Sequence, residues 1–130
     1  MIRGIGTDII EIGSIQKAME QSKRFAQRVF TENEISYCEN KPNKYQHYAA
    51  RFAAKEALMK ALKTGWNNGI QWKQIEVRNQ AGGAPEIFTA GKTKERLDEA
   101  GITTIEVSLS HSEQYAIAMV CIQEADSNMK

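Results

Sequence analysis

The sequence has few cysteines and prolines and no long apolar run. Its two cysteines, Cys38 and Cys121, show neither C-x-x-C spacing nor histidine-rich surroundings, so no zinc site is expected. No run of about 18 apolar residues occurs, so no membrane-spanning helix is expected. The first residues lack the basic and apolar regions of a secretion signal. These features favour a cytoplasmic protein that does not bind membranes.

The chain also lacks an excess of charge of either sign. Its formal net charge is +1, which does not favour nucleic-acid binding by the protein as a whole. Apolar residues make up 42% and charged residues 25% of the 130 residues, the balance of an ordinary folded protein. This length predicts a single domain over residues 1–123, followed by a disordered tail at 124–130.

The order of the expected elements predicts an α+β domain with an antiparallel sheet packed against helices on one side. Strands are expected at 2–12, 70–79, 86–89, 103–109 and 114–123, and helices at 14–29, 45–63 and 92–99. Thr31 and Glu34 have the spacing of a capping box, which predicts a further short helix that ends at 40–43. The strand 114–123 is the most apolar and is expected to be central.

Asp8, flanked by Ile9 and Ile10, interrupts the apolar segment GIGTDIIEI. Burying a bare carboxylate costs several kcal/mol, so Asp8 either lies at an exposed strand end or is paired, hydrogen-bonded or bound to a cation. The G-x-G start is not a dinucleotide fingerprint, because the third glycine is missing.

Glu56 and Lys60 lie one turn apart in the expected helix 45–63. They form either a routine surface pair, worth about 0.2–0.5 kcal/mol, or part of a site completed by Asp8. Two carboxylates and a lysine suit Mg²⁺, which is usually held by one or two carboxylates together with substrate phosphates. His111, within Ser110-His111-Ser112, is either a base or phosphate donor, or a loop residue without a role.

Together these segments resemble the bacterial holo-acyl-carrier-protein synthases, the small class of 4′-phosphopantetheinyl transferases. The resemblance covers nearly the whole chain. It is carried by GIGTDIIEI, RVFTENEI, RFAAKEALMKALKTG, IEVRNQAGGAP and VSLSHSEQYAIA. It implies the 4′-phosphopantetheinyl transferase fold. It also implies that the protein transfers phosphopantetheine from coenzyme A to a serine of apo-acyl carrier protein and releases adenosine 3′,5′-bisphosphate. The holo-carrier protein would then serve fatty acid biosynthesis.

The resemblance also implies roles for individual residues. Asp8 and Glu56 would hold Mg²⁺, Lys60 would contact phosphate, and Glu56 is the candidate base, directly or through water. The coenzyme A site would comprise Arg51, Lys60, Gly65, Gly83, Pro85, Ser110, His111 and Ser112. Members of the family form homotrimers with active sites between subunits, so His111 and the GGAP turn would come from the neighbour of the subunit that supplies Asp8.

Two positions depart from the family pattern. Ala84 replaces the lysine of the family's G-K-P turn, and Arg51 or Arg78 is expected to compensate for the lost charge. Lys63 stands where the family has a glycine. Lys63 would either add a phosphate contact or tighten the helix end.

The expected helix 14–29 is basic and suits an acidic partner. The resemblance places the carrier protein on this helix, with Arg24 and Arg28 as the main contacts and Phe25 as their apolar neighbour. The alternatives are another Mg²⁺-dependent nucleotide-processing enzyme, or a non-enzymatic module that binds coenzyme A or nucleotides. The combined presence of Asp8, Glu56 and Lys60 with the full-length pattern disfavours both.

Overall fold

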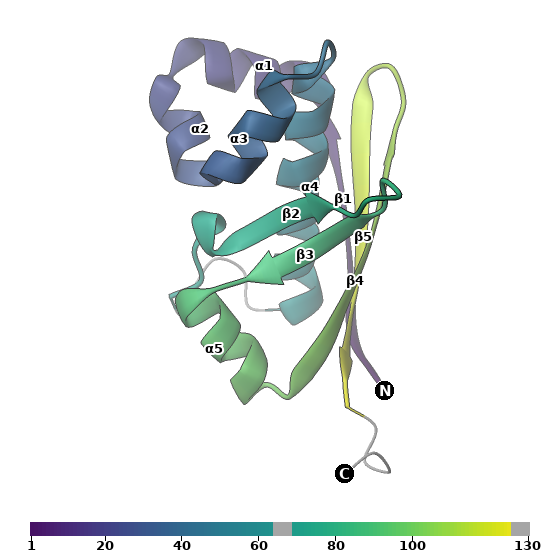
Figure 1. Ribbon diagram of the computed structural model, residues 1–130. Coiled ribbons are helices and arrows are strands. Elements are labelled where there is room, and N and C mark those ends of the chain that lie inside the picture. Colours follow the sequence, from purple (N-terminus) through teal and green to yellow (C-terminus); the bar gives the residue numbers. More distant parts are fainter. Residues whose placement is uncertain (64–68, 126–130) are drawn as a thin grey trace.

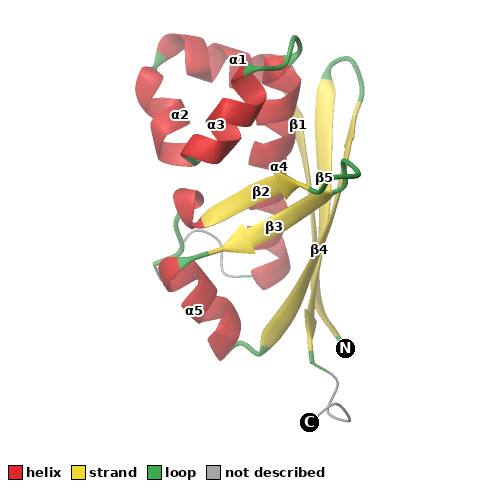
Figure 2. Ribbon diagram, viewed as in Figure 1, coloured by secondary structure: helices red, strands yellow, loops and turns green. Residues whose placement is uncertain are grey.

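The computed structural model describes residues 1–63 and 69–125, and it is built on a three-stranded antiparallel sheet. The strands are β1 (Ile2–Glu11), β5 (Tyr115–Glu124) and β4 (Ile102–His111), in the order β1-β5-β4. The helix α4 (Lys44–Leu62) lies along one face of this sheet (Figures 1 and 2). The α+β prediction is confirmed, and the most apolar strand is central as predicted.

A second, smaller sheet replaces part of the single sheet that we expected. It is a hairpin of β2 (Ile75–Asn79) and β3 (Pro85–Thr89), followed by α5 (Gly91–Glu99). The predicted strand 70–79 is correct only from Ile75, because Trp72–Gln74 form a 3₁₀ turn, η1. The Gln74 side-chain oxygen accepts hydrogen bonds from the backbone N–H (3.0 Å) and hydroxyl (2.9 Å) of Thr93, and this tertiary contact holds η1 against α5.

The segment expected to form one helix at 14–29 forms two, α1 (Ile12–Gln21) and α2 (Lys23–Val29). Ser22 separates them with extended backbone, and its hydroxyl accepts from the Arg24 N–H at 3.2 Å. The helix α3 (Glu32–Glu39) has the predicted capping box. None of the described helices is long and apolar enough to span a bilayer.

Two glycines of β1 allow α4 to lie directly on the strand. A Cβ atom at Gly4 would be 2.2 Å from the carbonyl oxygen of Ala61, and one at Gly6 would be 1.9 Å from the carbonyl oxygen of Ala57. Both distances are shorter than any real contact, so only glycine fits at these positions. The buried alanines of α4 serve the same close approach from the helix side.

A buried ion pair joins the helices to the hairpin. Lys55 Nζ donates to Glu34 Oε1 at 2.7 Å, to the Val29 carbonyl at 2.6 Å and to the Trp72 carbonyl at 3.0 Å. Glu34 in turn accepts from the Val77 N–H at 2.8 Å. These bonds satisfy both charges, which would otherwise be costly to bury. One pair thereby connects α2, α3, α4, η1 and β2.

β5 extends to Glu124, one residue into the expected tail. The Glu124 N–H donates to the Met1 carbonyl at 2.9 Å, which adds this residue to the sheet. Residues 126–130, which make up most of the expected tail, lie outside the described residues.

Lys63 caps α4 in the left-handed conformation, with φ of 64°. Among the described residues it is the only non-glycine with positive φ. Its N–H donates to the carbonyls of Met59 (3.0 Å) and Lys60 (3.2 Å), which ends the helix. Glycine adopts this backbone without the steric cost that a Cβ adds, which accounts for the glycine expected here.

We therefore expect Lys63→Gly to stabilise the protein by about 1 kcal/mol, measured by urea unfolding. Lys63→Ala is the matched control, because it removes the same charge but keeps the Cβ atom. Equal stability of the two variants would contradict the backbone explanation.

Candidate active site

A carboxylate and a lysine that are far apart in the sequence meet where α4 crosses β1. Asp8 follows Gly4 and Gly6 at alternate positions of the strand, so its side chain lies on the face that α4 covers. Lys60 Nζ is 3.0 Å from Asp8 Oδ1, and the Asp8 side chain is only 15% exposed. Asp8 is therefore not at an exposed strand end, and Lys60 reaches toward it.

Glu56 lies one turn before Lys60 on the same side of α4 and is half-buried. The helix and strand run in opposite directions here, since Ala61 lies over Gly4 and Ala57 over Gly6. Moving along β1 toward Asp8 therefore means moving back along α4 toward Glu56. The predicted trio of Asp8, Glu56 and Lys60 thus gathers at one crossing.

These side chains suit a metal that also binds substrate. Among the described residues, no group of three or more histidine, cysteine or acidic side chains forms a complete metal site. Two carboxylates beside a lysine nevertheless fit Mg²⁺, which keeps several waters and completes its shell with substrate phosphates.

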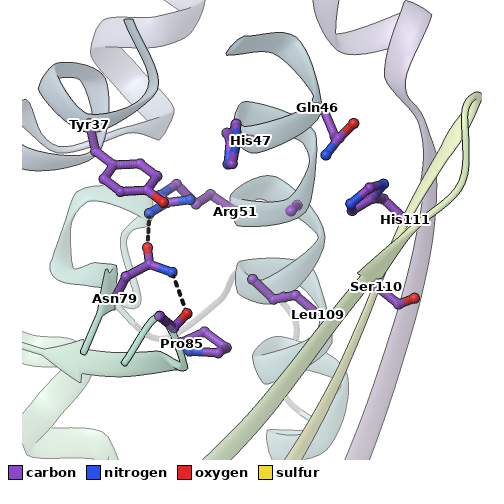
Figure 3. Close-up of a pocket in the computed structure, with 11 residues that line it drawn as sticks. Tyr37, Gln46, His47, Arg51, Asn79, Pro85, Leu109, Ser110 and His111 are labelled. Atoms are coloured by element: carbon purple, nitrogen blue, oxygen red, sulfur yellow. Dashed lines mark hydrogen bonds between the residues drawn. The ribbon is translucent and has the colours of Figure 1, made fainter. Parts of the chain in front are cut away.

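A separate cavity brings together most of the other predicted residues (Figure 3). It has a volume of about 190 Å³ and lies between α3, α4, the β2–β3 turn and β4. Its walls include the predicted residues Arg51, Gly83, Pro85, Ser110 and His111.

The remaining coenzyme A predictions fall elsewhere. Ser112 does not line this cavity. Its hydroxyl accepts from the Tyr115 N–H at 3.1 Å and shapes the β4–β5 turn instead. Gly65 lies outside the described residues.

Arg51 is the buried cation of this cavity. The residue is 2% exposed, and its Nη2 donates to Asn79 Oδ1 at 2.6 Å. Asn79 Nδ2 in turn donates to the Gly83 carbonyl at 3.0 Å, which connects Arg51 to the GGAP turn. Arg51 Nε is buried without a hydrogen-bond partner, and no acidic side chain among the described residues lines the cavity.

Arg51, and not Arg78, lies in the cavity beside Gly83 and Pro85, which flank Ala84, the residue that replaces the family's lysine. Arg78 pairs with Glu76 and stacks on Phe88 at 4.0 Å from the ring centre. Ala84 is exposed and lies outside the described lining of the cavity. Of the two residues expected to compensate, the geometry favours Arg51.

Sequence reasoning missed Tyr37, His47 and Asn79, which also line the cavity. His47 precedes Arg51 by one helical turn, so the spacing was visible in the sequence. Tyr37 and Asn79 reach the cavity from α3 and β2 and had no local signal.

The trio and the cavity lie on different sides of α4. Glu56 is five positions after Arg51, which places their side chains roughly 140° apart around the helix axis. None of Asp8, Glu56 and Lys60 lines the cavity. Within this chain, the two groups of residues therefore face different spaces.

The basic helix α2 contacts α4 through an aromatic pair that lies one turn before Glu56. Its Phe25 ring stacks on Phe52 with 6.2 Å between ring centres, and Phe52 precedes Glu56 by one turn of α4. Arg24 and Arg28 are exposed. Phe25 is half-buried, so it offers a partner only part of its ring.

The model of the 4′-phosphopantetheinyl transferase superfamily matches residues 4–120. The chain belongs to this superfamily. The matched segment spans β1 to β5 and includes Asp8, Glu56, Lys60 and every described wall residue of the cavity.

Individual relatives agree with this assignment. The chain is 47% identical over 125 residues to the holo-[acyl-carrier-protein] synthase of Ruminiclostridium cellulolyticum, a match that covers 95% of this chain and 93% of the relative. The crystal structure of the synthase from Neisseria meningitidis has a TM-score of 0.89 and 33% identity, with 95% and 100% of the two chains covered. The Bacillus anthracis synthase, solved in complex with CoA (3′,5′-ADP), has a TM-score of 0.80 and 35% identity, with 96% and 99% covered.

The predicted enzyme class and reaction are confirmed by this relationship. The phosphopantetheinyl transferase moves the phosphopantetheine arm of coenzyme A, its co-substrate, to apo-acyl carrier protein. The predicted 4′-phosphopantetheinyl transferase fold is likewise confirmed.

Proposed function

We propose that Asp8 and Glu56 hold Mg²⁺ at the pyrophosphate of coenzyme A and that Lys60 contacts the same phosphates. The observation that carries this proposal is the meeting of Lys60 with Asp8, at 3.0 Å, beside Glu56 on the same face of α4. When bound, Mg²⁺ would neutralise the charge that develops during phosphoryl transfer.

The residues of the chain have distinct tasks in this reaction. Glu56 is the candidate base that takes the proton from the carrier serine. The serine oxygen then bonds to the β-phosphate while the bond from that phosphate to the bridging oxygen breaks, and adenosine 3′,5′-bisphosphate leaves. Lys60 holds the phosphates in line for this displacement, where positioning contributes much of the rate.

The decisive experiment measures the mass of the carrier protein. Incubation with coenzyme A, Mg²⁺ and apo-acyl carrier protein should add one phosphopantetheine to the carrier and release one adenosine 3′,5′-bisphosphate. Release of a nucleotide without modification of the carrier would favour another Mg²⁺-dependent nucleotide enzyme. Binding of coenzyme A with neither product would favour a non-enzymatic module.

We also propose that the active site is shared between subunits of a homotrimer. No described helix or strand covers the face of the β1-β5-β4 sheet opposite α4 (Figure 1). This face carries Ile5, Ile9, Ile117 and Met119 at 53%, 60%, 41% and 47% exposure. Contiguous apolar patches of this kind mark interaction surfaces. Packing against copies of the same chain would cover this face and bring the cavity of one subunit near the trio of its neighbour.

A mixing experiment tests the shared site. Asp8→Asn and His111→Ala are each expected to be poorly active alone. When the two variants are mixed in equal amounts, unfolded and refolded together, they should recover about a quarter of wild-type activity. Each site takes Asp8 from one subunit and His111 from its neighbour, and in about one site in four both residues are intact.

The matched control mixes Asp8→Asn with Glu56→Gln. Asp8 and Glu56 of each site come from the same subunit, and every subunit in this mixture lacks one of them. No site is therefore intact, and no recovery is expected. Recovery in neither mixture would contradict the shared site.

The acidic carrier protein is proposed to dock on α2 through Arg24 and Arg28. Their exposure and the contact of Phe25 with Phe52 support this, since α2 adjoins the α4 face that carries Glu56. We propose a role in fatty acid biosynthesis in the cytoplasm, where the carrier would be supplied in its apo form.

Arg24→Glu should raise the KM for carrier protein by about tenfold and leave the KM for coenzyme A unchanged, because it reverses one charge of the docking face. Steady-state rates at two salt concentrations measure this. Lys94→Glu, on the exposed side of α5, is the matched control and should leave both values unchanged. An equal loss for coenzyme A in Arg24→Glu would place the docking face elsewhere.

A further inference from the structure

The cavity of Figure 3 contains positive charge, and no acidic side chain among the described residues lines it. Arg51 is buried, and its Nε has no partner. Its guanidinium lies 4.3 Å from the centre of the Tyr37 ring, and Lys41 Nζ lies 4.7 Å from the same centre. A buried guanidinium with a free N–H, in a cavity that no described carboxylate lines, is the complement of an anion.

His47 stands within this cluster of cations. Its ring meets the Tyr37 ring edge to face, with 5.6 Å between centres, and Arg51 follows it by one turn of α4. His111 reaches the cavity from β4, on the side away from Tyr37 (Figure 3). The groups packed from the β2–β3 hairpin, Asn79 and the GGAP turn, are uncharged.

Burial lowers the pKa of His47 below its usual value, and the nearby charges of Arg51, Lys41 and His111 lower it further. The imidazole is therefore neutral at neutral pH while the cavity holds no anion. A bound anion acts in the opposite direction, because it favours the protonated ring.

The reaction itself indicates which anion fits. Coenzyme A carries a pyrophosphate and a terminal 3′-phosphomonoester. The proposed function, on which this inference rests, places the pyrophosphate at Asp8 and Glu56. The 3′-phosphomonoester is therefore the anionic group of coenzyme A that is left to occupy the cavity beside Arg51. It carries about two negative charges above pH ~6 and three acceptor oxygens, which suit several donors at once.

We propose that His47 is a specificity-determining residue that gains a proton when the 3′-phosphomonoester of coenzyme A binds beside Arg51. His47 then donates a charge-assisted hydrogen bond to that phosphate. In this way the enzyme distinguishes coenzyme A from dephospho-coenzyme A by more than the fixed charge of Arg51.

The direction of the pH dependence follows from this. Above the pKa of His47 in the free enzyme, binding must take up a proton, so affinity for the 3′-phosphate falls as pH rises from 6.5 to 8.5. Ligands without this phosphate should show no such contribution.

Calorimetry on the full-length protein tests the proposal with adenosine 3′,5′-bisphosphate and adenosine 5′-monophosphate as probes. In buffers of different ionisation enthalpy, the wild type should take up more protons with the bisphosphate than with the monophosphate. His47→Gln keeps a neutral donor but cannot titrate. It should lose this additional uptake and bind the bisphosphate roughly tenfold more weakly at pH 6.5, with a much smaller difference at pH 8.5.

Gln46→Ala is the matched control, since Gln46 lines the same cavity and does not titrate. Any loss of affinity in this variant should be equal at both pH values. Unchanged proton uptake in His47→Gln would overturn the proposal.

A second measurement does not depend on a variant that must fold. The chain has only two histidines, so the NMR signals of His47 and His111 are easily assigned. The bisphosphate should raise the pKa of His47, and the monophosphate should not. If neither raises it while the enzyme still transfers phosphopantetheine, the role of His47 fails and the proposed function stands. If no transfer occurs at all, the proposed function fails independently.

Discussion

Asp8→Asn is expected to slow phosphopantetheine transfer by at least about 10²–10³-fold and to leave the fold intact. The amide has nearly the same shape as the carboxylate, so packing against α4 is kept. It has no charge, however, and is a much poorer ligand for Mg²⁺. Initial rates measured by mass spectrometry over a range of Mg²⁺ concentrations, with urea unfolding to check stability, would show the effect. Glu56→Gln should behave in the same way.

Lys60→Met separates the two roles that Asp8 can have. If Asp8 serves only as the partner of Lys60, Asp8→Asn and Lys60→Met should lower the rate equally and leave the Mg²⁺ dependence unchanged. If Asp8 holds the metal, only Asp8→Asn should raise the Mg²⁺ concentration needed for half-maximal rate. Wild-type rates for Asp8→Asn at limiting Mg²⁺ would remove this carboxylate from the mechanism.

Elements governed by local patterns were predictable from the sequence. The capping box of Thr31 and Glu34 forms within four residues, and the apolar content of β5 reflects its position between two strands. Boundaries set by distant contacts were not predictable. Helix α1 begins at Ile12 and not at the expected Ser14. At this boundary the Ile12 N–H donates to the carbonyl of Gln114, which is distant in the sequence, at 2.9 Å.

The site shows the same division. The sequence alone indicated the one-turn spacing of Glu56 and Lys60 and the carboxylate of Asp8 within an apolar segment. The resemblance then implied their roles. The contact of Lys60 with Asp8, across 52 residues, needed the crossing of α4 over β1. The partner of Arg51, Asn79, lies 28 residues away on β2, and nothing near either residue in the sequence indicated that they would meet.

The crossing itself depends on Gly6. Its backbone lies against the turn of α4 that contains Ala57, and Asp8 follows two residues later on the same face of β1. Any side chain at position 6 would separate the helix from the strand and would move Lys60 and Glu56 away from Asp8. Gly6, two residues before Asp8, therefore has a structural role that supports the proposed chemistry of Asp8.

Gly6→Ala should destabilise the protein by about 3 kcal/mol or more, because the added Cβ would be 1.9 Å from the Ala57 carbonyl oxygen and 2.7 Å from the Ala61 nitrogen, which are backbone atoms that cannot rotate away. Urea unfolding measures the loss, and the folded fraction should also transfer phosphopantetheine more slowly than the wild type.

Gly82→Ala is the matched control, since a Cβ there meets nothing within 4 Å, and it should change stability by less than about 0.5 kcal/mol. Soluble expression of Gly82→Ala alone would support the same conclusion if Gly6→Ala fails to fold. Equal stability of the two variants would show that the crossing of α4 and β1 tolerates a side chain, and that the geometry joining Asp8 to Lys60 does not depend on this glycine.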